Sequence, residues 1–263
     1  MFFFKEKIWQ NKKRRKLFVA LSSTLLALAI LFTTCAVYLG SYYHADDSQI
    51  ADFTFTTGYA FKETKNKDGD LIFTPQTEEV TTGFIFYPGG KVEHTAYIPL
   101  MRALARMGIL CIIEKMPFRL AVFDINAADG VTEKYPQITS WYIGGHSLGG
   151  AMAASYAKTH ANALNGVVLL AAYSTENLQN SGLRVLSIYG DKDGVLDHEK
   201  YQSRLSNLPT DYTEKIIEGG NHAYFGMYGN QNGDGVATIE NGYQIILTAH
   251  YIYEFVGNAT PTE

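Results

Sequence analysis

The sequence predicts an α/β fold in which helices flank a mostly parallel sheet. The main observation is an alternation of short apolar runs, typical of buried strands, with longer stretches of helical spacing. The strand-like runs lie at 83–87, 109–113, 140–143, 166–170, 184–189 and 213–217. A second observation is a glycine-flanked serine between one of these strands and a helix. A third is an uncharged segment near the N-terminus, which bears on the cellular location of the protein.

Further elements are expected at both ends of this alternation. Residues 52–62, rich in Phe, Thr and Tyr, predict an early strand, and residues 66–70 predict a hairpin turn leading into residues 71–73. These strands would form an antiparallel edge of the sheet. Residues 236–256 predict a C-terminal helix whose apolar stripe faces the core.

The serine motif is the pentapeptide Gly145-His146-Ser147-Leu148-Gly149. It follows an apolar strand and precedes an alanine-rich helix, which is the context of a nucleophile elbow. The flanking glycines suit a tight turn in which backbone segments come too close for a Cβ. The alternative is an ordinary serine N-cap after a glycine turn. Ser147 is the candidate nucleophile.

An acid and a histidine follow the serine, each just beyond the end of a strand. Asp193 is the candidate acid and His222 the candidate base, in the order Ser, Asp, His. Serine needs a base to accept its proton, and the base needs an acid to orient it. Asp191 and Asp197 are rival acids, of which Asp191 is expected to cap the turn. His146 is expected to pack beside the serine.

Acyl transfer also needs donors for the developing oxyanion. The N–H of Leu148 is one candidate, because it follows the nucleophile. The second is expected from the loop after the strand at 83–87, with Gly90 preferred and Lys91 as the alternative. A plain Pro-Gly turn is the other interpretation of that loop.

Together these motifs resemble the α/β-hydrolase superfamily, specifically its compact members related to dienelactone hydrolase. The resemblance covers about residues 80–256 and rests on Tyr87–Gly90, Gly145–Gly149, Gly190–Asp193 and Gly220–Ala223. It implies an eight-stranded, mostly parallel sheet flanked by helices. Dienelactone hydrolases have cysteine at the elbow, whereas this chain has Ser147. That difference favours a reaction like that of a serine esterase.

The substrate side of the site is less specified. No long insertion separates the strands at 166–170 and 184–189, so we expect an open site without a helical lid. Tyr173 and Ser174 lie just past a strand end and are candidate substrate contacts. Helix-cap or core roles are equally compatible with both residues.

The N-terminal region predicts a membrane anchor. Residues 1–16 form a basic tail. Residues 17–40 contain no charge, and this segment is long enough for one helix across a bilayer. The basic flank predicts a cytoplasmic N-terminus and a catalytic domain outside the membrane. A cleaved signal peptide, which would leave a secreted protein, is the alternative.

The remaining chain is expected to form a polar stalk at 41–51 and one α/β-hydrolase domain at 52–263. The net charge of −4 argues against nucleic-acid binding. Cys35 and Cys111, the only cysteines, are not expected to pair. No cofactor and no metal is expected. Residues 230–235 resemble half of a calcium loop, but Asn241 stands where the bidentate Glu is required.

These observations predict a membrane-anchored, extracytoplasmic serine hydrolase that cleaves a carboxylic ester or related acyl bond. Its expected partners are a small acyl substrate and the membrane; no obligate protein partner can be inferred. Two alternatives stay open: an acyltransferase at the cell surface, and a non-catalytic binding protein that keeps the fold.

Overall fold

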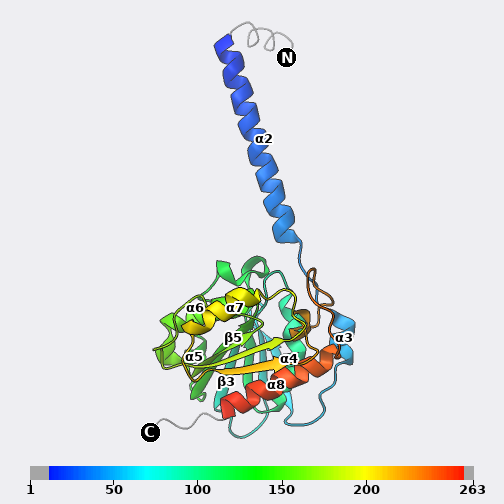
Figure 1. Cartoon of the computed structure of the whole chain (residues 1–263), viewed down its shortest axis with the longest axis vertical. Coiled ribbons are helices and arrows are strands. Elements are labelled where there is room, and N and C mark those ends of the chain that lie inside the picture. Colours follow the sequence, from blue (N-terminus) through cyan, green and yellow to red (C-terminus); the bar gives the residue numbers. More distant parts are fainter. Residues whose placement is uncertain (1–11, 258–263) are drawn as a thin grey trace. The chain divides into compact units, whose positions relative to one another are not determined.

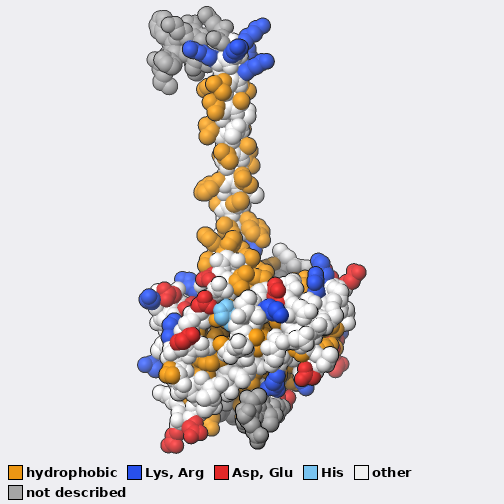
Figure 2. Space-filling model, turned by 90° about the vertical axis from the view of Figure 1, so that its left-hand side faces the viewer, with side chains coloured by type: hydrophobic (Ala, Val, Ile, Leu, Met, Phe, Trp, Pro, Cys, Tyr) orange, Lys and Arg blue, Asp and Glu red, His pale blue; other side chains and the backbone are white. Residues whose placement is uncertain are grey.

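The computed structural model describes residues 12–257, so most of the expected basic tail lies outside the described residues. The chain divides into two compact units, one ending at Ser41 and the other beginning at Tyr42. The described part of the first unit is helix α2 (Lys12–Gly40), whose 29 residues include none that is buried. Lys and Arg side chains gather at its beginning, and hydrophobic side chains cover most of its length (Figure 2).

Helix α2 is long and apolar enough to cross a membrane. At 1.5 Å per residue it would measure about 43 Å, against a hydrocarbon core of about 30 Å. Five Ser and Thr hydroxyls within it donate hydrogen bonds to carbonyls four residues earlier, so these polar groups are satisfied within the helix.

The second unit is built on one eight-stranded sheet (Figure 1). The strands are β1 (Phe61–Lys65), β2 (Leu71–Pro75), β3 (Thr82–Tyr87), β4 (Leu110–Ile113), β5 (Ser140–His146), β6 (Gly166–Leu170), β7 (Arg184–Gly190) and β8 (Thr213–Ile217). Their order is β1-β2-β4-β3-β5-β6-β7-β8. The two pairings of β2 are antiparallel and all others are parallel. The predicted α/β architecture is therefore confirmed, including its antiparallel edge.

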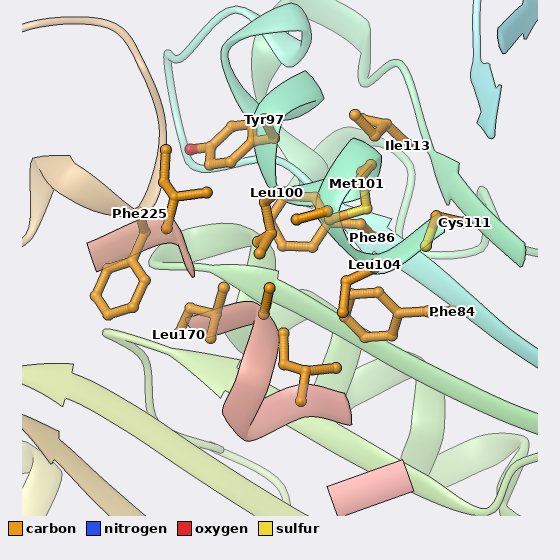
Figure 3. Packing of buried hydrophobic residues seen from close by; sticks show 14 of the residues in the cluster. Phe84, Phe86, Tyr97, Leu100, Met101, Leu104, Cys111, Ile113, Leu170 and Phe225 are labelled. Atoms are coloured by element: carbon orange, nitrogen blue, oxygen red, sulfur yellow. The ribbon is translucent and has the colours of Figure 1, made fainter. Parts of the chain in front are cut away.

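Helices cover both faces of the sheet. On one face, α4 (Ile98–Arg106) and α8 (Asn241–Gly257) enclose a cluster that includes Phe84, Phe86 and Leu104 (Figure 3). On the other face, α5 (Val131–Lys134) and α6 (Leu148–Thr159) enclose a second cluster. The remaining helices are α3 (Asp47–Asp52), α7 (His198–Arg204), and 3-10 turns at His94–Tyr97, Pro117–Arg119, Ala121–Phe123, Ala161–Ala163, Leu205–Asn207 and Ala223–Phe225.

The register of the central strands brings two loops of the candidate site together. Tyr87, the last residue of β3, pairs with Gly145 near the end of β5. A Cβ added to Gly145 or Gly149 would collide with the backbone carbonyl of Tyr87. The glycines therefore allow the turn after β5 to pack directly on the start of the loop after β3, as the sequence indicated.

Two elements begin later in the chain than the sequence-based expectations. A strand over 52–62 is wrong: β1 begins only at Phe61, because Phe53 and Phe55 pack into the core and Gly58 adopts φ +100°. The C-terminal helix begins at Asn241 because the Thr238 N–H donates to the Gly219 carbonyl, which holds the preceding residues as a loop.

The segment expected to be a polar stalk also differs, because it packs on the domain. The N–H of Tyr43 donates to the carbonyl of Lys91, and the N–H of Glu93 donates to the carbonyl of Tyr43. Helix α3 follows, capped by Asp46 and with Ile50 buried. The aromatic and apolar side chains among the polar residues of 41–51 supply this packing.

Candidate functional site

Ser147 lies at the sharp turn between β5 and α6. Its backbone has φ 53° and ψ −122°, a conformation that costs a non-glycine residue about 1–3 kcal/mol. The turn is held by its N–H, which donates to the Leu170 carbonyl at 2.8 Å. Although Ser147 occupies the N-cap position, its side chain makes no capping hydrogen bond. The hydroxyl is thus not used by the helix, which argues against the N-cap interpretation.

Asp193 and His222 form a buried pair. Asp193 Oδ2 lies 2.8 Å from His222 Nδ1, and neither side chain is more than 1% exposed. Asp193 Oδ1 accepts the N–H groups of Val195 and Leu196 at 2.9 and 2.8 Å, which fixes the carboxylate in place. The arrangement leaves His222 Nε2 as the imidazole nitrogen available for proton transfer.

The two rival acids are engaged elsewhere. Asp191 Oδ1 accepts the N–H of Gly219, and its other oxygen pairs with Lys192, as expected for a residue that holds the turn. Asp197 caps α7 by accepting the N–H of Lys200. Of the three acids after β7, the structure brings Asp193 alone to His222.

Ser147 and His222 line the same pocket, of about 360 Å³. His222 Nε2 is buried and makes no hydrogen bond with any described residue. It is therefore not bonded to Ser147 Oγ in this conformation. Rotation about one side-chain bond changes the direction of a serine hydroxyl. Hydrogen bonds between a nucleophile and its base often tighten only when substrate binds. The geometry supplies an oriented base beside an uncommitted hydroxyl.

The two candidate oxyanion donors lie beside each other. A Cβ added to Gly90 would lie 3.0 Å from the Leu148 side chain. Leu148 is the first residue of α6, so its N–H has no acceptor within the helix. The N–H of Gly90 has no hydrogen-bond partner among the described residues, whereas that of Lys91 donates to the Arg119 carbonyl. Gly90 is consequently the better placed of the two alternatives.

The two candidate substrate contacts are placed differently. Tyr173 lines the pocket, together with the neighbouring Thr175. Ser174 does not line it: its hydroxyl donates to the Glu176 carbonyl and accepts the Glu176 N–H, and the residue is buried. Ser174 thus stabilises its own turn. The rest of the pocket wall is mostly apolar, with Asp197 as its acidic member; the apolar residues are Leu148, Ala151, Met152, Ala171, Ala172, Val195 and Leu196.

Comparison with known proteins supports this interpretation of the fold. A sequence model of the Alpha/beta hydrolase family matches residues 83–245, which is more than half of the chain and includes Ser147, Asp193 and His222. The chain belongs to the alpha/beta hydrolase family. Its fold and family support a hydrolase-type function.

A crystal structure of a predicted CIB-like hydrolase from Thermoplasma acidophilum resembles this alpha/beta hydrolase with a TM-score of 0.52. The sequences are 15% identical, and the match covers 75% of this chain and 100% of that one. At this identity the likeness shows the fold alone. No curated protein matches the chain.

His146 packs beside the elbow of this alpha/beta hydrolase, as the sequence indicated. It is fully buried, its ring centre lies 4.5 Å from that of His222, and it does not line the pocket. Burial, with a further contribution from His222, lowers the pKa of His146 well below its usual range. His146 is therefore neutral at physiological pH, so it places no positive charge beside His222.

Sequence reasoning missed Asp234, which joins the loop that carries Asp193 to the loop that carries His222. Its Oδ1 accepts the N–H groups of Gly194 at 3.1 Å and His222 at 3.2 Å. Its Oδ2 accepts the N–H of Ala223 at 2.8 Å. These bonds connect the residue after Asp193 with His222 itself. The only available signal was the turn-rich run 230–235, which suggested half of a calcium loop.

In the alpha/beta hydrolase domain, the Asp234 carboxylate is thus occupied by backbone donors. No group of three or more His, Cys, Asp or Glu side chains among residues 12–257 could hold a metal ion. Cys35 and Cys111 are both free, the first exposed in α2 and the second buried in β4.

Another buried acid lies beyond the candidate site. Glu114 directly follows β4, is 4% exposed, and has an Oε1 without a hydrogen-bond partner among the described residues. Burial, reinforced by the neighbouring Asp70, raises the pKa of Glu114 to about 8. This carboxyl is mainly protonated at neutral pH, which has consequences for stability.

Proposed function

We propose that this protein is a membrane-anchored serine hydrolase that cleaves a carboxylic ester or related acyl bond outside the cytoplasm. The observation that carries the proposal is the buried pairing of Asp193 with His222 beside the pocket that Ser147 also lines. A purely structural role would not require an imidazole that a buried carboxylate orients and that also lines a pocket with an unbonded serine. Helix α2 supports the anchor through its length and apolar surface.

The first half of the reaction forms an acyl-enzyme. Ser147 Oγ attacks the substrate carbonyl carbon while its proton passes to His222 Nε2, and Asp193 stabilises the resulting imidazolium. The carbonyl electron pair moves onto oxygen, where the N–H groups of Leu148 and Gly90 bind it. Collapse of this intermediate breaks the acyl bond, and the leaving alcohol takes the proton from His222.

Water completes the cycle. His222 accepts a proton from water as its oxygen attacks the acyl carbon on Ser147. Collapse of the second intermediate releases the acid, and Ser147 recovers its proton from His222. The mostly apolar pocket wall suits the acyl or alcohol portion of an ester.

The deciding experiment is labelling of the full-length protein with a fluorophosphonate, followed by intact mass measurement and peptide mapping. We expect one adduct, on Ser147, and none in Ser147→Ala or His222→Ala. The matched control is Ser203→Ala, which removes an exposed hydroxyl from α7 and should label like the parent protein. A folded parent protein that acquires no adduct would overturn the serine-hydrolase proposal.

A further inference from the structure

The first residues of the second compact unit are held at a defined position on the surface of that unit. Tyr42, its first residue, lies two residues after the end of α2 at Gly40, a path of at most about 8 Å along the chain. The guanidinium of Arg119 lies 3.3 Å from the centre of the Tyr42 ring. Tyr43 is hydrogen-bonded to Lys91, in the loop after β3. The N-terminal end of this unit is therefore held beside Arg119.

Exposed apolar side chains lie in the same segment as Arg119. Phe118 is 58% exposed, Phe123 57% and Val122 49%. The rings of Phe118 and Phe123 meet edge to face with centres 5.8 Å apart, so these side chains form a contiguous surface, called here the 118–123 patch. Single exposed apolar residues need no explanation, but a contiguous group on a soluble surface indicates a contact site.

The backbone holds this patch in an unusual shape. Phe118 has φ 51° and Arg119 φ 60°, values uncommon for residues other than glycine. The conformation is maintained because the Arg119 N–H donates to the Met116 carbonyl, while the Arg119 carbonyl accepts the Lys91 N–H. On the inner side of the segment, Ala121 is fully buried. The exposed Phe rings are thus presented by an anchored turn.

The charges beside the patch are mixed, with a small excess of basic groups. A hollow of about 470 Å³ includes Phe118 and Arg119 in its wall. Its other charged or titratable residues are Lys65, Lys115, His94, Asp68 and Glu93. Exposed Phe and other apolar side chains combined with long basic side chains are typical of protein segments that lie at the membrane–water interface.

We propose that the 118–123 patch rests in the headgroup and acyl boundary of the bilayer that α2 spans. The argument is continuity: Arg119 covers Tyr42, and Tyr42 follows the proposed anchor by two residues. The patch is therefore tethered close to the lipid surface. This inference rests on the proposed anchor and is independent of the proposed chemistry of Ser147.

Leu120, within the same segment, lies close to Gly90: its Cδ2 would be 3.6 Å from a Cβ added there. Contact of the patch with lipid would bring this side of the candidate site to the membrane surface. Acyl substrates carried by the bilayer would then reach the enzyme without crossing bulk water.

The test uses full-length protein in nanodiscs of phosphatidylcholine and phosphatidylglycerol. A bimane label is placed at Val122→Cys, or at Tyr253→Cys as the matched control, in a Cys35→Ser background. The two sites are 49% and 47% exposed, and Tyr253 lies near the end of α8; Cys111 is buried. Quenching by spin-labelled phosphatidylcholine reports contact with lipid. Phe123→Cys is a second reporter in case one variant fails to fold.

We expect the Val122 and Phe123 labels to be quenched at least about twofold more strongly than the Tyr253 label, because interfacial groups lie about 5–10 Å into the boundary. Equal quenching at the patch and control sites would overturn the inference. So would a patch label shielded equally in detergent, which would indicate a second protein copy. Failure to enter nanodiscs would refute the anchor and with it this inference, whereas an unreactive Ser147 would leave the quenching result unchanged.

Discussion

The hydroxyl of Tyr97 lies 2.8 Å from His146 Nδ1 and also accepts the N–H of Gly89 at 3.1 Å. Because the backbone N–H supplies one proton, the tyrosine proton is free to point at Nδ1. One hydroxyl thereby joins the loop that carries Gly90 to the residue before Ser147. Tyr97 is fully buried, and a Cβ added to Gly89 would collide with the Tyr97 hydroxyl and with His146 Nδ1.

Tyr97→Phe should weaken both the fold and the reaction. The change leaves the Gly89 N–H and His146 Nδ1 buried without partners, which should lower the free energy of unfolding by about 1–3 kcal/mol. Chemical denaturation measures this loss, and kcat should fall because Gly90 is less well held. The control is Tyr142→Phe, since the Tyr142 hydroxyl makes only long contacts of 3.4 and 3.5 Å. Equal losses in the two variants would contradict the proposed connection.

Asp193→Asn should abolish most activity while leaving the fold intact. An amide can donate to Nδ1 and so favours the wrong tautomer of His222, and kcat should fall about 10³- to 10⁴-fold with little change in KM. Steady-state kinetics on an activated ester measure the effect. Asp191→Asn is the matched control, because that carboxylate bonds Gly219 and Lys192 instead. A comparable loss of kcat in the control would mean that the acid has been misassigned.

Asp234→Ala should reduce kcat through the positions of the two loops. Without the carboxylate, the N–H groups of Gly194 and Ala223 lose their acceptor, and a small displacement of His222 should cost about 10- to 100-fold in kcat. KM should change little, and Asp234→Asn should restore part of the rate because its amide oxygen still accepts. The control is Asp46→Ala, which also removes a carboxylate that accepts a backbone N–H group, but at the start of α3. No difference between Asn and Ala at position 234 would contradict the positioning role.

Glu114→Gln should stabilise the protein at alkaline pH. The pKa of Glu114 is raised from 4.5 to about 8, so between these values the folded state binds a proton that the unfolded state lacks. Wild-type stability from this group therefore falls as pH rises through that window, by at most about 1.4 kcal/mol per pH unit. Glutamine has no proton to lose, so the stabilisation it gives over wild type should grow from pH 4.5 to 8. Thermal unfolding at several pH values would detect it; a pH-independent difference would contradict it.

Regular periodicity made the central sheet predictable. The runs that became β3, β4, β6, β7 and β8 match the structure to within one residue, because buried parallel strands are continuous apolar segments with clear ends. Residues 52–62 do not form the predicted strand, because their structure is irregular up to Phe61. Their aromatic composition suits a strand, but Phe53 and Phe55 contribute to the core from an irregular segment. Composition alone does not separate these two uses of an aromatic side chain.

Some residues of the candidate site could likewise be predicted from the sequence, and others could not. Ser147, Asp193 and His222 could be proposed because each follows a strand whose end is readable, and the sheet then brings those ends to one edge. Tyr97 and Asp234 could not. Tyr97 meets His146 across 49 positions of sequence, and Asp234 meets Gly194 across 40. Such contacts depend on how loops close over the sheet, and no local pattern records that closure.

The sheet ends on both sides in strands that carry charge. β1 presents Lys62, Glu63 and Lys65 to solvent, and β8 includes Glu214 and Lys215. Unpaired strand edges invite a neighbouring molecule to continue the ladder, and charged side chains there oppose it. Copies held at high local concentration, as they would be under the membrane anchoring proposed above, would meet these edges often. The charges give such copies resistance to strand-by-strand aggregation.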